Sequence, residues 1–232
     1  MIDNKFLKAA KDLLSPTMGT ENIGPFIYDI IKITRARKIL EIGGGYTSIF
    51  ILKALADNET LYSDDSVIEK TLKNEVYYSK KENNSRLHLV DDLSHPQTTA
   101  NLISNKAKQL NLDSFLILHD ADFTTFSKNF PDSELPIDLL WLDCGDLNSY
   151  QIFLNEYFPL VNKNGGIVLI HSLLTNLHGQ FFLKQLKLSQ ATNQFNDFEL
   201  ISLLEPHKTR QNSLTMLRFI TNESTQIYTV MP

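Results

Sequence analysis

Short runs of Ile, Leu and Val alternate with stretches of helical periodicity along most of the chain. Near-continuous apolar runs predict strands buried on both faces, and apolar residues three or four positions apart predict helices with one buried face. Strands are expected at 37–42, 87–90, 115–118, 137–142 and 167–170, and helices at 6–14, 26–31, 47–56, 98–110 and 150–158. This alternation predicts a parallel sheet covered by helices on both faces.

The final third of the chain has a different pattern. Residues 198–204 and 213–220 have the composition of strands, and a polar connection joins them, which predicts an antiparallel pair at one edge of the sheet. With the five earlier strands, they predict an α/β fold. Its sheet is expected to be doubly wound, seven-stranded and mostly parallel, with an antiparallel C-terminal edge.

Two segments are expected to lie outside this alternation. Residues 1–35 are expected to form a helical cover ahead of the first strand. Residues 58–85 are polar, carry Ile68, Leu72 and Val76 at helical spacing, and are longer than an ordinary connection. We interpret this segment either as an inserted helix that forms a lid over the site or as a solvated surface excursion.

Composition narrows the class of protein. The chain has 232 residues and is 42% hydrophobic, so a single domain over 1–232 is expected to bury its own core. The formal net charge is −5, and the 22 Lys and Arg residues form no basic stripe, which disfavours a nucleic-acid partner.

Cys144 is the only cysteine in the sequence. No apolar run approaches the ~20 residues of a membrane span, and charged residues interrupt the apolar positions of the N-terminal segment, unlike in a signal peptide. We therefore expect a cytoplasmic protein with no membrane partner.

A glycine-rich turn carries the main candidate chemistry. The residues Glu41-Ile42-Gly43-Gly44-Gly45-Tyr46-Thr47-Ser48 lie between the first expected strand and the helix that follows. Glycine permits close backbone approach, and a helix N-terminus offers free N–H groups, so a small polar ligand is expected here. A dinucleotide fingerprint would require a third glycine where Ser48 stands, which disfavours a nicotinamide cofactor. An acid two residues before the first glycine instead resembles the motif of class I, Rossmann-like S-adenosylmethionine-dependent methyltransferases.

The resemblance implies how the cofactor S-adenosylmethionine, and its product S-adenosylhomocysteine, would be held. A carboxylate at the end of the second strand would accept both ribose hydroxyls, and spacing leaves the choice between Asp91 and Asp92 open. The third strand ends in His119-Asp120-Ala121, which is similar to a Gly-Asp-Ala element whose acid meets the adenine amino group, with His119 replacing the glycine. The implied cofactor-binding residues are Glu41, Gly43, Gly44, Gly45, Tyr46, Ser48, Asp91, Asp92, Asp120, Ala121 and Asp143.

The fourth and fifth strands carry a second part of the resemblance. The run Trp141-Leu142-Asp143-Cys144-Gly145, followed by Tyr150 and Gly165-Gly166, resembles small-molecule O-methyltransferases related to the catechol enzymes. In those relatives, a divalent metal is bound by an Asp at the position of Asp143 and by an Asp-Asn pair after the fifth strand. This chain has His171-Ser172 there, and serine is a poor metal ligand, so we expect no bound metal.

The same replacement makes His171 a candidate general base, because an imidazole can take a proton from a nucleophile at neutral pH. Asp143 would orient or polarise it. The alternative is a strand-end histidine whose ring is satisfied by the backbone. Further candidates for contact with a substrate are Tyr77, Tyr78, His207 and Asn212.

Several functions remain open at this point. The expected reaction is transfer of a methyl group to a hydroxyl or amine of a small molecule. A homodimer is a possible assembly. An aminopropyltransferase has a similar fold but normally carries paired acids for a polyamine, a demand that Asp143 and Asp146 meet only in part. A third alternative is a scaffold that binds the cofactor without catalysis.

Overall fold

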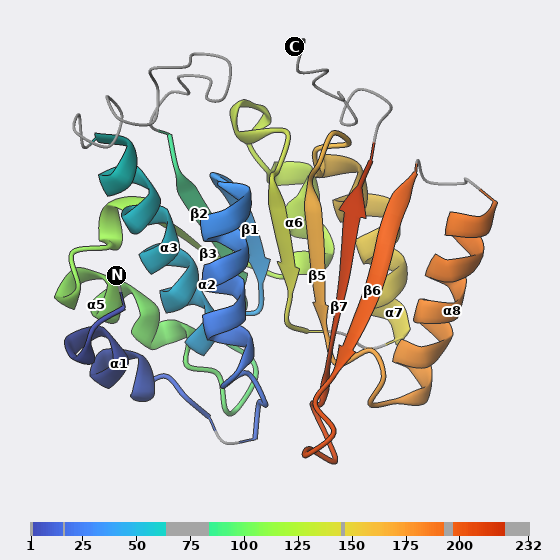
Figure 1. The fold of residues 1–232 in the computed structure, drawn as a ribbon, viewed down its shortest axis with the longest axis horizontal. Coiled ribbons are helices and arrows are strands. Elements are labelled where there is room, and N and C mark those ends of the chain that lie inside the picture. Colours follow the sequence, from blue (N-terminus) through green and yellow to red (C-terminus); the bar gives the residue numbers. More distant parts are fainter. Residues whose placement is uncertain (1, 16, 64–83, 145–146, 193–196, 221–232) are drawn as a thin grey trace, which may run out of the picture. The chain divides into compact units, whose positions relative to one another are not determined.

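The computed structural model describes residues 2–15, 17–63, 84–144, 147–192 and 197–220. These residues fall into two compact units, Met1–Asp122 and Phe123–Pro232. Each unit is described by itself, and the expectation of a single domain over 1–232 stays a prediction. Figure 1 shows the strands and helices of both units.

The first unit contains three parallel strands, with β2 in the middle. Their bounds are β1 (Lys38–Ile42), β2 (Arg86–Asp91) and β3 (Leu116–Asp120). Four of the five β1 residues are buried, as its apolar run predicts, whereas β3 is only partly covered. Because the strands are parallel, their carboxyl ends lie at one edge of this part of the sheet.

Helices cover the strands of the first unit. They are α1 (Asn4–Lys11), α2 (Ile23–Thr34), α3 (Tyr46–Ser63) and α5 (Ala100–Gln109). Close packing of α2 on α3 depends on Gly24, where a Cβ atom would lie 2.8 Å from ring atoms of both Tyr46 and Phe50. The helical cover predicted for residues 1–35 is thus formed by α1 and α2.

Helix α3 is longer than the sequence predicts, since it continues past residue 56 to Ser63. Asn58 explains part of this extension, because its buried side chain donates to the Ile31 carbonyl (3.1 Å) and accepts from the Arg35 guanidinium (2.9 Å). Helix α3 thus occupies the start of the insertion predicted near 58–85, and the inserted helix itself stays a prediction. Residues 64–83, which include Tyr77 and Tyr78, lie outside the described residues.

The second unit contains four strands in the order β4-β5-β7-β6. Strands β4 (Leu139–Leu142) and β5 (Ile167–His171) are parallel, and β7 (Ser213–Phe219) and β6 (Phe198–Leu204) complete an antiparallel edge. The predicted fold class is confirmed: the protein has a seven-stranded, mostly parallel sheet with an antiparallel C-terminal edge.

The helices of the second unit include two that the sequence pattern did not predict. One is the short helix α6 (Phe123–Phe126). Helix α7 (Leu147–Ile152) continues through a π-helical turn and corresponds to the helix predicted at 150–158. The longer of the two missed helices is α8 (Leu177–Ala191). Its outer face carries Leu177, Phe181 and Leu188, which are 81%, 55% and 64% exposed. Apolar residues on both faces hide the one-sided periodicity that predicts an amphipathic helix.

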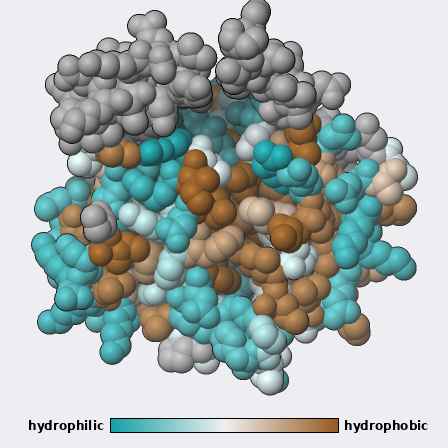
Figure 2. Space-filling model, viewed as in Figure 1, coloured by the Kyte–Doolittle hydropathy of each residue, from teal (hydrophilic) through white to brown (hydrophobic). Residues whose placement is uncertain are grey.

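Apolar side chains also lie at the surface of the edge strand. Ile201 and Leu203 on β6 are exposed, and Figure 2 shows hydrophobic side chains at the surface in this region. Among the residues that the structure describes, no helix is both long enough and apolar enough to cross a lipid bilayer.

Lys163 supplies a test of packing at the base of β5. Its ammonium donates to the Phe158 carbonyl (2.5 Å) and lies 3.9 Å from the centre of the Phe219 ring, and burial lowers its pKa to about 8. Between pH 8 and about 10.5, the unfolded chain binds more protons at this lysine than the folded chain does, so the free energy of unfolding should rise with pH. Urea titrations should show that rise in the wild type relative to Lys163→Met. Parallel curves for the two proteins across this window would contradict the assignment.

Candidate functional site

The glycine turn after β1 has a shape that other residues would not allow. Gly43 has φ +88°, which an L side chain rarely adopts. A Cβ atom at Gly44 would lie 2.9 Å from the Ala100 Cβ atom and 2.9 Å from a methyl group of Leu89. The turn is therefore held close to β2 and α5, and it requires glycine at both positions.

The three glycine N–H groups of this turn are already engaged within the protein. Gly43 donates to the Val90 carbonyl (2.9 Å), Gly44 to Asp91 Oδ2 (2.8 Å), and Gly45 to Ser48 Oγ (3.0 Å). What the turn offers a ligand is accordingly close backbone approach, not free glycine amides. Ser48 is fully buried, so its hydroxyl braces the turn from inside.

The structure separates the two adjacent acids at the end of β2. Asp91 Oδ2 accepts from the Gly44 N–H, and its Oδ1 accepts from the Leu93 N–H (2.8 Å). Asp92 is exposed, where hydrogen bonds from Ser94 hold its pKa below the ordinary value. Asp91 therefore lies beside the glycine turn. Each of its oxygens retains a second lone pair that can accept from a ligand hydroxyl.

Glu41 is completely buried, and its Oε1 accepts a hydrogen bond from the Thr47 hydroxyl (2.7 Å). This hydrogen bond joins the carboxyl end of β1 to the first turn of α3, on either side of the three glycines. Sequence reasoning gave no role to Thr47, although a hydroxyl residue in the first turn of a helix is a weak signal for such a contact. Tyr46 packs on Phe50, with ring centres 4.9 Å apart, and burial raises the pKa of its phenol.

The end of β3 lies next to Asp91 by strand pairing. Asp120 is the register partner of Asp91, and the Ala121 N–H donates to the Asp91 carbonyl (3.3 Å). The Asp120 side chain is exposed. His119, which stands where the related element has glycine, contacts His88 through ring nitrogens 3.0 Å apart, and burial lowers its pKa.

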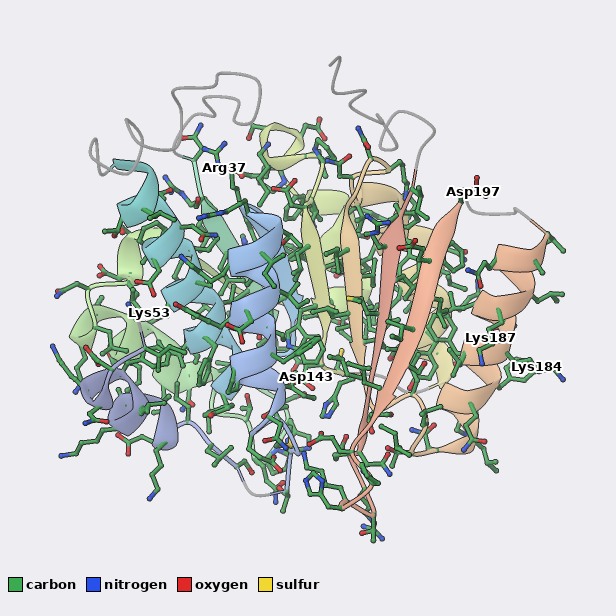
Figure 3. All side chains as sticks on the ribbon, viewed as in Figure 1. Arg37, Lys53, Asp143, Lys184, Lys187 and Asp197 are labelled. Carbon is green, nitrogen blue, oxygen red and sulfur yellow. The ribbon has the colours of Figure 1, made fainter. Side chains whose placement is uncertain are left out.

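In the second unit, Asp143 and His171 form a close pair at the carboxyl ends of β4 and β5. His171 Nδ1 lies 2.6 Å from Asp143 Oδ1, and the side chains are only 6% and 13% exposed. Figure 3 labels Asp143 at the lower end of β4 in that view. An ionised carboxylate can only accept, so Nδ1 carries the proton and Nε2 is left as an acceptor. Nε2 is buried and has no hydrogen-bond partner among the described residues.

The other predicted residues of the second unit lie on the β6–β7 connection. His207 is an exposed turn residue whose Nε2 lies 3.8 Å from Glu205. Asn212 is engaged on both sides of its amide, because it accepts from Thr175 (3.2 Å) and donates to the Lys208 carbonyl (3.2 Å). Their predicted contact with a substrate stays a prediction.

The expectation of a metal-free site also stays a prediction. Among the described residues, no three or more His, Cys, Asp or Glu side chains are grouped so that they could hold a metal ion. The expectation rests on the available metal ligands. Asp143 is hydrogen-bonded to His171, and the residue that follows His171 is Ser172, a poor metal ligand.

A glycine turn after the first strand, with acids at the ends of the following parallel strands, defines the α/β proteins that bind a nucleoside cofactor at the strand ends. The sequence matches the methyltransferase domain family over residues 40–173. The chain belongs to this family, and it is an S-adenosylmethionine-dependent methyltransferase, as the sequence predicts.

Solved structures share the fold. The O-methyltransferase TomG from Streptomyces achromogenes, in complex with S-adenosylmethionine, is 14% identical with a TM-score of 0.63, and the match covers 95% of this chain and 92% of TomG. An O-methyltransferase from Bacillus cereus, in complex with S-adenosylhomocysteine, is 16% identical with a TM-score of 0.60, covering 94% and 92%. The Podospora anserina methyltransferase PaMTH1 is 14% identical with a TM-score of 0.57, covering 95% and 89%. A search of curated protein sequences gives no significant match.

Proposed function

We propose that this methyltransferase methylates a hydroxyl group of a small molecule and that His171 is its general base. The observation that carries the proposal is the pair formed by His171 and Asp143, in which a buried Nε2 atom has no hydrogen-bond partner among the described residues. A buried hydrogen-bond acceptor without a partner destabilises a protein. The hydroxyl group of the substrate that is to be methylated would donate the missing hydrogen bond to Nε2.

The first unit has residues that fit the cofactor. The Asp91 carboxylate lies beside the glycine turn, held there by the Gly44 N–H, and its oxygens keep lone pairs that can accept from a ligand. We propose that Asp91 holds the ribose, that Asp120 and Ala121 contact the adenine, and that Glu41 fixes the turn through Thr47. Within this proposal, Tyr46 supports the turn by packing on Phe50, Ser48 supports it by accepting from the Gly45 N–H, and Asp92 has no direct role.

The cofactor supplies a methyl group that its sulfonium has already activated. The protein therefore has to orient the acceptor and remove its proton. His171 Nε2 takes the proton from the hydroxyl as the oxygen becomes the nucleophile, and Asp143 stabilises the imidazolium that forms. The imidazolium then releases its proton to solvent, which restores the starting state without a metal ion.

A small-molecule hydroxyl is favoured over other acceptors by two observations. The formal net charge of −5 opposes binding to a polynucleotide. TomG, which is involved in tomaymycin synthesis, and the Bacillus cereus enzyme are both O-methyltransferases of similar fold. An amine acceptor would use the same base, so it is a test outcome and not a separate mechanism.

The proposal is tested by measuring S-adenosylhomocysteine formation from S-adenosylmethionine with panels of phenols, aliphatic alcohols and amines. Turnover with a hydroxyl panel is expected. Turnover with amines alone would overturn the hydroxyl assignment. A parallel incubation with decarboxylated S-adenosylmethionine and putrescine tests the aminopropyltransferase alternative, and cofactor binding without turnover on any panel would indicate a scaffold.

A further inference from the structure

The residue that follows His171 has an unusual backbone conformation. Ser172 has φ +64°, in the left-handed region that residues other than Gly, Asn and Asp seldom occupy. Such a conformation persists only when surrounding contacts hold it. The contacts around Ser172 are therefore a place to look for residues that set the position of His171.

A chain of hydroxyl and amide groups holds Ser172. Its Oγ lies 2.5 Å from Thr175 Oγ1, and Thr175 Oγ1 donates to Asn212 Oδ1 (3.2 Å). A threonine hydroxyl has a single proton, so Ser172 must be the donor to Thr175. The amide of Asn212 in turn donates to the Lys208 carbonyl (3.2 Å), which ties this chain to the β6–β7 connection.

A second brace comes from the first residue of β7. Ser213 is fully buried, and its carbonyl accepts from the Ser172 N–H (2.7 Å) while its hydroxyl accepts from the Leu174 N–H (3.0 Å). The segment after β5 is thus held on its main chain by Ser213 and on its side chains by Thr175 and Asn212.

We propose that Thr175 and Asn212 are positioning residues for His171, acting through Ser172. This inference rests on the proposed function, in which His171 is the base. Loss of the Thr175 hydroxyl contact leaves Ser172 held by its main-chain contacts, including the one with Ser213, so we expect its φ to relax toward an ordinary value. That rotation reorients the peptide that joins His171 to Ser172. The bond from His171 Nδ1 to Asp143 is 2.6 Å long. Hydrogen bonds weaken steeply when their angle departs from linear, so a rotation of the imidazole ring weakens this bond.

The first test compares Thr175→Val with Thr175→Ser. Valine has nearly the shape of threonine but loses the hydroxyl, whereas serine keeps it. With a hydroxyl acceptor from the panel, Thr175→Val is expected to lower kcat by about 10- to 100-fold, with the Kd for S-adenosylhomocysteine unchanged and the acid limb of the kcat/KM pH profile displaced. Thr175→Ser should restore wild-type kcat and pH profile. Wild-type kcat in Thr175→Val would overturn the proposal, as would an equal loss in both variants.

The second test needs no acceptor. Protein labelled with ¹⁵N-histidine gives the tautomer and titration of each ring, and the signal that disappears in His171→Asn belongs to His171. The wild type and Thr175→Ser should show a single tautomer protonated at Nδ1, and Thr175→Val should show a mixture. An unchanged His171 signal in Thr175→Val overturns the positioning role whether or not His171 is the base. Full turnover in His171→Asn would instead overturn the proposed function.

If Thr175→Val fails to fold, Asn212→Ala tests the same positioning role. This change removes the acceptor for Thr175 but leaves both hydroxyls of the chain in place. The expected result is the same displacement of the His171 signal, and a wild-type signal and kcat in Asn212→Ala would then reject the inference.

Discussion

Exchange of His171 for asparagine is expected to lower kcat by roughly 10²–10⁴-fold, the range that loss of a general base typically produces. Asparagine can still form a hydrogen bond to Asp143, but it has no basic nitrogen in place of Nε2. Initial rates of S-adenosylhomocysteine formation, measured with a hydroxyl acceptor at saturating cofactor, give the comparison.

His178→Asn is the matched control for this loss. His178 is exposed on α8, so the same substitution there should leave kcat within about 2-fold of the wild type. Asp143→Asn should also lower kcat, because an amide can present its N–H to the ring and favour the wrong tautomer. If His171→Asn turns over at the wild-type rate, His171 is a buried strand-end histidine and another group removes the proton.

Exchange of Asp91 for asparagine is expected to weaken binding of S-adenosylhomocysteine by about 10- to 150-fold. A hydrogen bond to a charged group contributes ~1.5–3 kcal/mol, and the amide can accept only one of the two ribose hydroxyls with its single oxygen. Isothermal titration calorimetry with S-adenosylhomocysteine measures the change directly.

The neighbouring acid supplies the control. Asp92→Asn removes the same charge one residue further along, on an exposed turn, and should change the Kd by less than about 3-fold. Equal losses in the two variants would point to a general electrostatic effect. A larger loss in Asp92→Asn would reverse the assignment of the ribose contact.

Much of the fold could be predicted because the signal was local. Strands such as β1 and β5 are apolar runs buried on both faces, and the glycine turn follows directly from Gly43 to Gly45. Helix α8 was not predicted, since exposed Leu177, Phe181 and Leu188 interrupt its polar face and hide the helical periodicity. The end of α3 was missed because the side chain that anchors it, Asn58, contacts α2 and not its own helix.

The sequence indicates which polar residue types lie at the strand ends but not which contacts they make. Alternation along β2 predicts that only one of Asp91 and Asp92 points toward the glycine turn, and the hydrogen bond from Gly44 shows that this residue is Asp91. The contact between Thr175 and Asn212 spans 37 positions of the chain, and no spacing rule relates residues on different elements.

A crystal structure of the protein in complex with S-adenosylhomocysteine tests the central claim most directly. The account predicts that the ligand's ribose lies against the turn from Gly43 to Gly45, with both hydroxyls donating to the Asp91 carboxylate. A ligand bound elsewhere, or a ribose that meets Asp92 while Asp91 contacts only Gly44 and Leu93, would contradict it.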